Sequence, residues 1–174
     1  MWRRLPIVAA AALTLSFGAP AADTAGLVVL MRHAEAPGVG DPDGFRLGDC
    51  STQRNLNDSG RAQARRMGDR LRTLGIGQAR VLSSQWCRCL ETARLLNLGP
   101  VEEAPALNSF FGRPEEREKK TAAMRAFLAG LPPNGPPVVL VTHQITITAL
   151  TGLGAASGEA ILLRRDGTVV DRLR

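Results

Sequence analysis

The chain contains only two histidines, and each follows a short apolar segment with the composition of a buried strand. His33 ends the segment 27–33 (LVVLMRH), and His143 ends the segment 138–143 (VVLVTH). Histidine can act as a nucleophile, a proton carrier or a metal ligand near neutral pH. Ligands of an open α/β sheet bind beyond the carboxyl ends of its strands, so we expect the two imidazoles to share one crevice.

Two arginines accompany the histidines at this predicted sheet edge. Arg32 directly precedes His33, and Arg88 follows a third strand end at Ser83 and Ser84. Guanidinium donors match phosphate oxygens, and a neutral imidazole can attack phosphorus. The set therefore predicts phosphoryl chemistry, with the cations stabilising the transferring group. We interpret Ser84 as a helix cap rather than a nucleophile, because no G-x-S-x-G turn surrounds it.

The elements that must position these residues alternate between strand and helix patterns. We predict strands over 27–32, 79–83 and 138–142, helices over 57–74, 86–96, 121–131 and 144–150, and a final hairpin over 160–172. Residues 101–120 are expected to be irregular, and Trp86, Phe110 and Phe111 are assigned to the core. This alternation predicts an α/β fold, a three-layer α/β/α sandwich with a mainly parallel central sheet.

The segment 37–55 is a polar, glycine-rich connection that is long for a compact domain, which is typical of a functional lid. Its aspartates Asp41, Asp43 and Asp49 suggest a calcium loop. Their spacing lacks the ligand ladder and terminal glutamate of an EF-hand. We therefore interpret the segment as a solvated loop.

The first 21 residues have the pattern of a secretory signal peptide. A basic start over 1–4 precedes an apolar, alanine-rich stretch over 5–17, and Ala19-Pro20-Ala21 fits a cleavage site. An uncleaved anchor is the alternative, although the stretch is short for a membrane span. Cleavage after Ala21 would leave one domain, 22–174, in the periplasm with no stable membrane span.

The charge and cysteine patterns narrow the class of partner and the compartment. The formal net charge is +6, the chain has no tyrosine, and its arginines are spread along it, which argues against a nucleic-acid partner. The three cysteines include no CxxC pair, so a zinc site is not expected. In an oxidising compartment we predict a disulfide between Cys50 and Cys87, with Cys89 buried. Three free thiols are the alternative.

Four segments together resemble the histidine phosphatase superfamily, whose fold is phosphoglycerate mutase-like. Residues 31–35 (MRHAE) resemble its R-H-G/A signature, 54–64 (RNLNDSGRAQA) its R-x-L-T-x-x-G-x-x-Q-A segment, 83–93 (SSQWCRCLETA) its S-S-P-x-x-R-x-x-x-T-A segment, and 141–143 (VTH) its closing V-x-H. They occur in the family's order and span nearly the whole of 22–174. The chain is most similar to the short, SixA-sized members, which have no large cap domain.

The resemblance implies a role for each matching residue. His33 would be the phosphorylated nucleophile, Arg32 and Arg88 the phosphate clamps, and His143 the second imidazole, acting as a charged donor. The family needs no metal and no cofactor. As candidate substrate-binding residues we add Arg54 and Glu35 to the two clamps.

One position departs from the family pattern. Where the family carries an acid, this chain reads LNSFFG over 107–112, and the Asn108 amide cannot protonate an alkoxide leaving group. Glu35, Glu115 and Glu116 are the candidate substitutes. The sequence therefore predicts an exported, metal-independent phosphohydrolase. It would form a phosphohistidine on His33 and act on a phosphomonoester, a phosphohistidine or an envelope phosphate group. The alternative is a phosphate-group binding protein with little or no turnover; the oligomeric state is left open.

Overall fold

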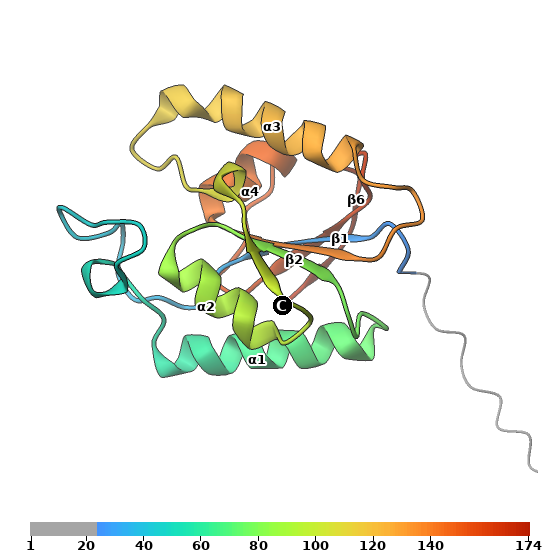
Figure 1. Ribbon diagram of the computed structural model, residues 1–174, viewed down its shortest axis with the longest axis horizontal. Coiled ribbons are helices and arrows are strands. Elements are labelled where there is room, and N and C mark those ends of the chain that lie inside the picture. The colour runs from blue at the N-terminus through green and yellow to red at the C-terminus, as the bar shows by residue number, and fades with distance from the viewer. Residues whose placement is uncertain (1–23) are drawn as a thin grey trace, which may run out of the picture.

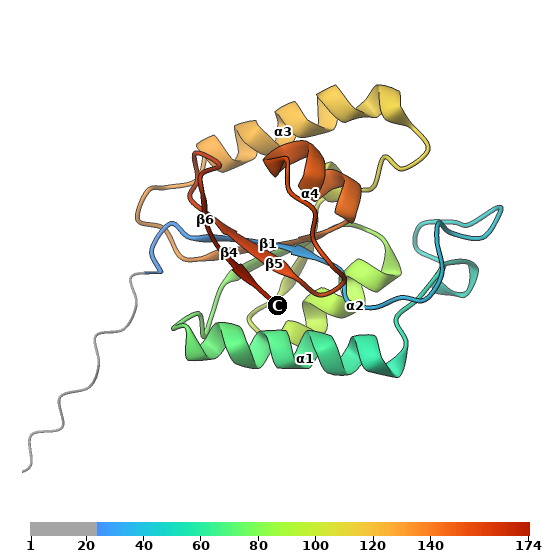
Figure 2. The same cartoon turned by 180° about the vertical axis from the view of Figure 1, so that it is seen from behind.

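The computed structural model of the protein describes residues 24–174, and the predicted signal peptide over 1–21 lies outside them. A six-stranded sheet forms the centre of the domain, with the strand order β3-β2-β4-β1-β5-β6. Helices α1 and α2 cover one face of the sheet, and α3 and α4 cover the other (Figures 1 and 2). The strands are β1 (Val28–Arg32), β2 (Arg80–Ser83), β3 (Val101–Glu103), β4 (Val138–Thr142), β5 (Ala160–Leu163) and β6 (Val169–Leu173). The helices are α1 (Asp58–Thr73), α2 (Cys87–Leu96), α3 (Arg117–Ala129) and α4 (Gln144–Thr151).

The sheet is mainly parallel, which confirms the predicted three-layer α/β/α sandwich. Strands β3, β2, β4 and β1 run parallel, and the hairpin of β5 and β6 joins β1 in the antiparallel sense. In register, Arg32 pairs with Thr142 and Ser83 pairs with Val141. The carboxyl ends of β1, β2 and β4 therefore meet at one edge of the sheet.

Each face of the sheet has its own hydrophobic core. Val29 and Met31 of β1 pack in the core that includes Met67 of α1, whereas Val28 and Leu30 pack in the core that includes α3 and α4 residues. A strand that is buried on both faces needs apolar residues at successive positions, which explains the uninterrupted apolar runs in the sequence.

Helix α1 holds the segment that follows β1. Its predicted cap is confirmed, because the Asn57 side chain accepts from the Gly60 N–H at 2.7 Å. A Cβ atom on Gly60 would lie 2.1 Å from the Glu35 carbonyl oxygen. Only glycine allows this approach, so the start of α1 is seated directly against the chain just beyond His33.

Three sequence predictions about the middle of the chain are wrong. The segment predicted to be irregular contains the edge strand β3, which is three residues long and has two exposed glutamates, so the sequence shows no apolar alternation there. The third helix begins at Arg117 rather than at Thr121, because its first turn is charged and carries no apolar signal. Phe110 is buried as expected, but Phe111 is 65% exposed and does not belong to the core.

Within residues 24–174, no helix combines the length and the apolar character that crossing a bilayer requires.

Candidate active site

His33 lies just past the end of β1 and is almost completely buried, with 3% of its surface exposed. Its Nδ1 atom is 2.8 Å from the Ala34 carbonyl oxygen, which can only accept a hydrogen bond. Nδ1 therefore carries the proton, and Nε2 keeps its lone pair. Burial, and less strongly the nearby Arg88 cation, lowers the pKa of His33 to about 3. The imidazole is thus neutral at pH 7 and has the electron pair that a nucleophile needs.

His143 follows β4 and meets His33 at the same edge of the sheet, as the sequence predicted. The two ring centroids are 5.5 Å apart, with an angle of 70° between the ring planes. The Nε2 atom of His143 is 2.8 Å from the Ser84 hydroxyl oxygen. Burial first, and then the positive charge of Arg88, holds the pKa of His143 well below its usual value.

Ser84 contacts this second imidazole and is not the N-cap of α2, so the predicted capping position is wrong; its hydroxyl accepts from the Trp86 N–H, at 3.4 Å, one residue before the helix. The N-terminal cap position of α2 is Trp86, which makes no side-chain capping bond. The turn that carries Ser84 is held by Asn108, whose Oδ1 atom accepts from the Ser84 hydroxyl at 3.2 Å and from the Gln85 N–H at 2.9 Å. The amide at this position supports the site by these hydrogen bonds and has no acidic proton to supply.

Arg88 brings a positive charge directly to the His33 imidazole. It lies in the first turn of α2, is 4% exposed, and donates from Nε to His33 Nε2 at 3.2 Å. Its terminal nitrogens Nη1 and Nη2 donate to the two carboxylate oxygens of Asp41, at 2.6 and 3.1 Å.

Asp41 is the residue of the site that the sequence analysis missed. We predicted a solvated loop at this position, whereas the Asp41 side chain is 9% exposed and bound to Arg88. The pKa of its carboxyl is lowered; burial alone would raise it, but hydrogen bonds from Arg88, Arg54 and Trp86 and the charge of Arg88 outweigh that. The available signal was indirect: a buried arginine needs an acidic partner, and the segment 37–55, called the lid below, carries three aspartates.

Arg32 offers a further hydrogen-bond donor beside His33. Its Nη1 atom donates to the Ala155 carbonyl at 3.0 Å, and its Nε atom is buried with no hydrogen-bond partner among residues 24–174. A buried N–H without a partner costs free energy, so this donor is well suited to an anionic ligand.

Arg54 and Glu35 make contacts within the protein. The Arg54 guanidinium donates to the Gly40 carbonyl at 2.7 Å and to the Ala36 carbonyl, and so holds the start of the lid. The Glu35 carboxylate accepts from Asn57 and from Ser59 at the start of α1, at 3.0 and 3.1 Å. Substrate binding by these two residues stays a prediction.

The predicted disulfide between Cys50 and Cys87 is present and joins the lid to the first residue of α2. Gln53 adds a second attachment, because its Oε1 atom accepts from the Cys87 N–H at 3.0 Å. Cys89 is free and buried as expected, and burial raises the pKa of its thiol to about 12. It is therefore a neutral thiol at pH 7.

The net charge of the groups around the two histidines is opposite in sign and similar in size to that of a phosphate group. Arg32, Arg54 and Arg88 act electrostatically on His33, Asp41 is bonded to Arg88, and both imidazoles are neutral at pH 7. Three guanidinium groups and one carboxylate leave a net charge of two positive. A phosphate monoester carries a charge of about −1.5 to −2 at pH 7.

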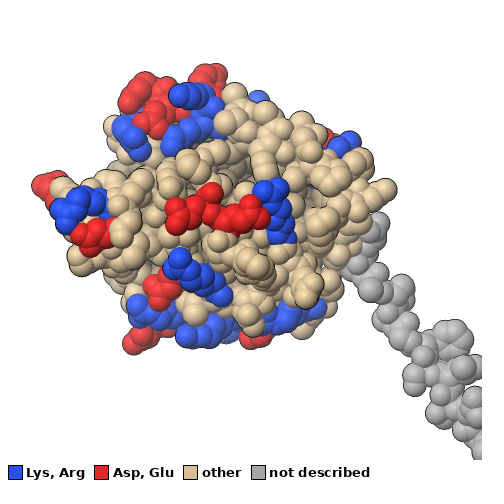
Figure 3. Space-filling view, in the orientation of Figure 1, with Lys and Arg blue, Asp and Glu red and all other residues tan. Residues whose placement is uncertain are grey.

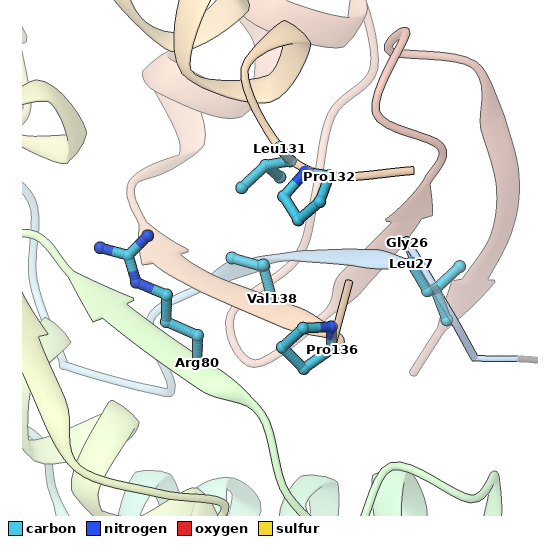
Figure 4. Close-up of a pocket in the computed structure, with 7 residues that line it drawn as sticks. All are labelled: Gly26, Leu27, Arg80, Leu131, Pro132, Pro136 and Val138. Atoms are coloured by element: carbon cyan, nitrogen blue, oxygen red, sulfur yellow. The ribbon is translucent and has the colours of Figure 1, made fainter. Parts of the chain in front are cut away.

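Other features of the molecule lie apart from this site. A cavity of about 220 Å³ opens at the opposite edge of the sheet, near Leu27 and Val138 at the amino ends of β1 and β4 (Figure 4). On the face in Figure 3, basic and acidic side chains are interspersed. In the part of the chain that the structure describes, no group of three or more His, Cys, Asp or Glu side chains is arranged to hold a metal ion.

Comparisons with known proteins agree with this geometry. Residues 28–129 match a family model described as histidine phosphatase superfamily (branch 1). The fold is similar to that of the protein histidine phosphatase SixA complexed with tungstate, with a TM-score of 0.60 and 17% identity over 84% of this chain and 96% of the other. It is also similar to a mycobacterial glucosyl-3-phosphoglycerate phosphatase complexed with VO3, with a TM-score of 0.58 and 20% identity over 80% and 92% of the chains.

A curated relative matches in sequence over a shorter region. It is the mitochondrial serine/threonine-protein phosphatase Pgam5 of Drosophila virilis, which is 39% identical over 69 residues. The match covers 40% of this chain and 21% of that protein, so the chain corresponds to about a fifth of this relative.

Proposed function

The chain belongs to the histidine phosphatase superfamily and has the fold of its SixA-like members, and from this premise we propose that it is a phosphatase with a covalent phosphohistidine intermediate on His33. The observation that carries the proposal is the His33 Nε2 lone pair, buried and 3.2 Å from the Arg88 Nε atom. A neutral nucleophile beside a fixed cation suits attack on a phosphoryl group.

In the first step of the proposed reaction, His33 Nε2 attacks phosphorus with its lone pair. The bond from phosphorus to the leaving group breaks, and its electron pair departs with that group. The imidazole becomes positively charged, and its Nδ1–H donates to the Ala34 carbonyl at 2.8 Å, which favours that charge. Arg88 and Arg32 stabilise the negative charge on the phosphoryl oxygens.

In the second step a water molecule attacks the phosphohistidine. The bond between phosphorus and Nε2 breaks, its electron pair returns to His33, and a proton of the water passes to the phosphate or to solvent. His143 supports both steps as a donor. An arriving phosphate anion raises the pKa of His143 from its depressed value and so favours the charged imidazolium.

The substrate we propose is a small phosphorylated molecule or an envelope phosphate group whose leaving group departs readily. Asn108 occupies the position where the family carries an acid, and its amide is engaged with Ser84 and Gln85. Phosphohistidine, pyrophosphate and aryl phosphates need no strong acid to leave. Alkyl phosphates are expected to be poorer substrates.

We further propose that the protein is exported and works without a metal ion. The disulfide between Cys50 and Cys87 supports an oxidising compartment such as the periplasm. The guanidinium groups supply the positive charge that a metal ion supplies in metallophosphatases.

The replacement His33→Ala tests the proposal, with 4-nitrophenyl phosphate as the substrate. We expect phosphate release to fall on the order of 10³-fold or more, because the variant has no nucleophile. Rapid quenching of the wild type should trap an acid-labile phosphate that the variant lacks, and a chelator should not change the rate. Turnover by the variant at the wild-type rate would exclude the mechanism.

A phosphate-group binding protein is the second candidate, and Asn108 is the observation that favours it. Such a protein would bind inorganic phosphate or vanadate through Arg88 and Arg32 with no turnover of any phosphate ester. Binding without hydrolysis of 4-nitrophenyl phosphate would favour this candidate over the enzyme.

A further inference from the structure

The carboxylate of Asp41 is buried and fully hydrogen bonded. It accepts from both terminal nitrogens of Arg88, from the Trp86 indole N–H at 3.0 Å and from the Arg54 backbone N–H at 3.2 Å. Charge-assisted, two-pronged pairs of this kind are the strong ones in proteins. The contact raises the question of whether Asp41 occupies the place of the phosphate or supports the cation that binds it.

Asp41 supports the cation, because Asp41 and His33 contact different edges of the Arg88 guanidinium group. The group carries five N–H donors in one plane. Asp41 engages the terminal edge, formed by Nη1 and Nη2, whereas Nε–H on the side edge points at His33 Nε2. A phosphoryl group attacked by His33 Nε2 meets the side edge, so phosphate and Asp41 bind to different edges of the same guanidinium.

Two further observations argue against displacement of Asp41 by substrate. Removing its carboxylate would strand the Trp86 indole N–H and the Arg54 N–H, both of which it satisfies. It would also remove the carboxylate that offsets the mutual repulsion of the Arg32, Arg54 and Arg88 charges.

We propose, on the basis of the function proposed above, that Asp41 is a positioning residue for phosphoryl transfer. It holds the terminal edge of Arg88 so that the Nε edge faces the phosphorus at His33 Nε2, and it stays on Arg88 throughout turnover. The role of the lid is then to place the Asp41 carboxylate against the terminal nitrogens of Arg88. The disulfide at Cys87 fixes the lid to α2 one residue before Arg88.

The replacement Asp41→Asn tests the proposal, with Asp43→Asn as the matched control. Asp43 lies two positions along the same lid, is exposed, and undergoes the same chemical change. We expect Asp41→Asn to lower kcat for 4-nitrophenyl phosphate about 10- to 100-fold, because a misplaced catalytic group can cost up to 10²-fold. KM should change by less than about 3-fold, because this loss falls mainly on the transition state. Asp43→Asn should match the wild type in both.

Inhibition constants show whether Asp41 positions Arg88 or instead blocks the phosphate site. Vanadate resembles the five-coordinate transition state, whereas inorganic phosphate resembles the product. If Asp41 is a positioning residue, Asp41→Asn should raise the inhibition constant of vanadate by a larger factor than that of inorganic phosphate. If the variant instead binds phosphate more tightly and has a higher kcat/KM, Asp41 blocks the site and the proposal is wrong. Kinetics equal to those of Asp43→Asn, or a change confined to KM, would overturn it as well.

A crystal structure of the wild-type protein with vanadate tests the same point even if Asp41→Asn folds poorly. The two oxygens of Asp41 should still lie within hydrogen-bonding distance of the Arg88 terminal nitrogens, with vanadate accepting from Arg88 Nε. A carboxylate that has left Arg88 would refute the proposal. Activity retained by His33→Ala would refute the proposed function, whereas an inactive His33→Ala with a fully active Asp41→Asn would refute the role of Asp41 alone.

Discussion

At the scale of single residues, the two histidines couple stability to pH. The pKa of each lies below its usual value of 6.5 in the folded protein, at about 3 for His33. Between these values the unfolded chain takes up a proton that the native protein does not, so stability falls as the pH drops below about 6.5. The lowered pKa of Asp41 acts only nearer pH 4, where its stabilising charge begins to be lost.

We therefore expect the free energy of unfolding to decrease from pH 7 to pH 5, with about 2 kcal/mol of the decrease due to His33. Urea denaturation at several pH values measures this change. The variant His33→Gln should show a shallower dependence, because it lacks the titrating group. Parallel curves for the two proteins would mean that His33 is not held neutral by the fold.

The sequence could predict the histidines and arginines of the site but not Asp41. Arg32, His33 and His143 are tied to strand ends, and the parallel register leaves them no other place to converge. Asp41 lies in a loop, where no periodicity indicates direction, and its burial depends on a tertiary contact with Arg88.

At the scale of elements, the lid depends on the disulfide between Cys50 and Cys87. Replacement of Cys50 by Ser should lower stability by about 2–4 kcal/mol, because a closed loop restricts the unfolded chain. It should also lower kcat in the same direction as Asp41→Asn, because the carboxylate is then less firmly placed.

The two replacements together show whether the lid acts through Asp41. Cys50→Ser should cause little further loss of kcat when it is added to Asp41→Asn, because the effects of two replacements that act through the same contact do not add. A reductant should slow the wild type and leave Cys50→Ser unchanged, which controls for unrelated effects of the reagent. Full additivity of the two replacements would separate the disulfide from Asp41.

The central elements were predictable and the peripheral ones were not. Strands β1 and β4 are buried on both faces, so their composition alone identifies them. Strand β3 has three residues at the edge of the sheet, with Glu102 and Glu103 exposed, and it forms because β2 offers a partner. Edge strands of this length carry too little apolar pattern to be recognised.

At the scale of the whole molecule, we predict that the first 21 residues are removed during export. Mass spectrometry of the protein recovered from the periplasm should give a chain that begins at Ala22. Ala21→Phe should block processing, because the cleavage site requires a small residue at that position. A chain recovered with residues 1–21 intact would support the alternative of an uncleaved anchor.

The overall architecture follows from the binary pattern and tolerates wide divergence elsewhere. The similar structures share 17% and 20% of their residues with this chain, yet most of each chain superimposes. Buried strands and one apolar face for each helix are sufficient to specify the layers. The lid lies outside this pattern, which is why its contacts had to come from the structure.

Trp86 is an intrinsic fluorophore within the candidate site. The chain has no tyrosine, and its other tryptophan, Trp2, falls within the predicted signal peptide. The Trp86 indole donates to Asp41 and lies with its ring centroid 5.2 Å from that of His143 and 5.5 Å from that of Phe45 in the lid. The ultraviolet fluorescence of a chain over 22–174 therefore arises beside Asp41 and His143. We expect its intensity and wavelength to report whether the Asp41 contact is intact and whether His143 is protonated, with no dye attached.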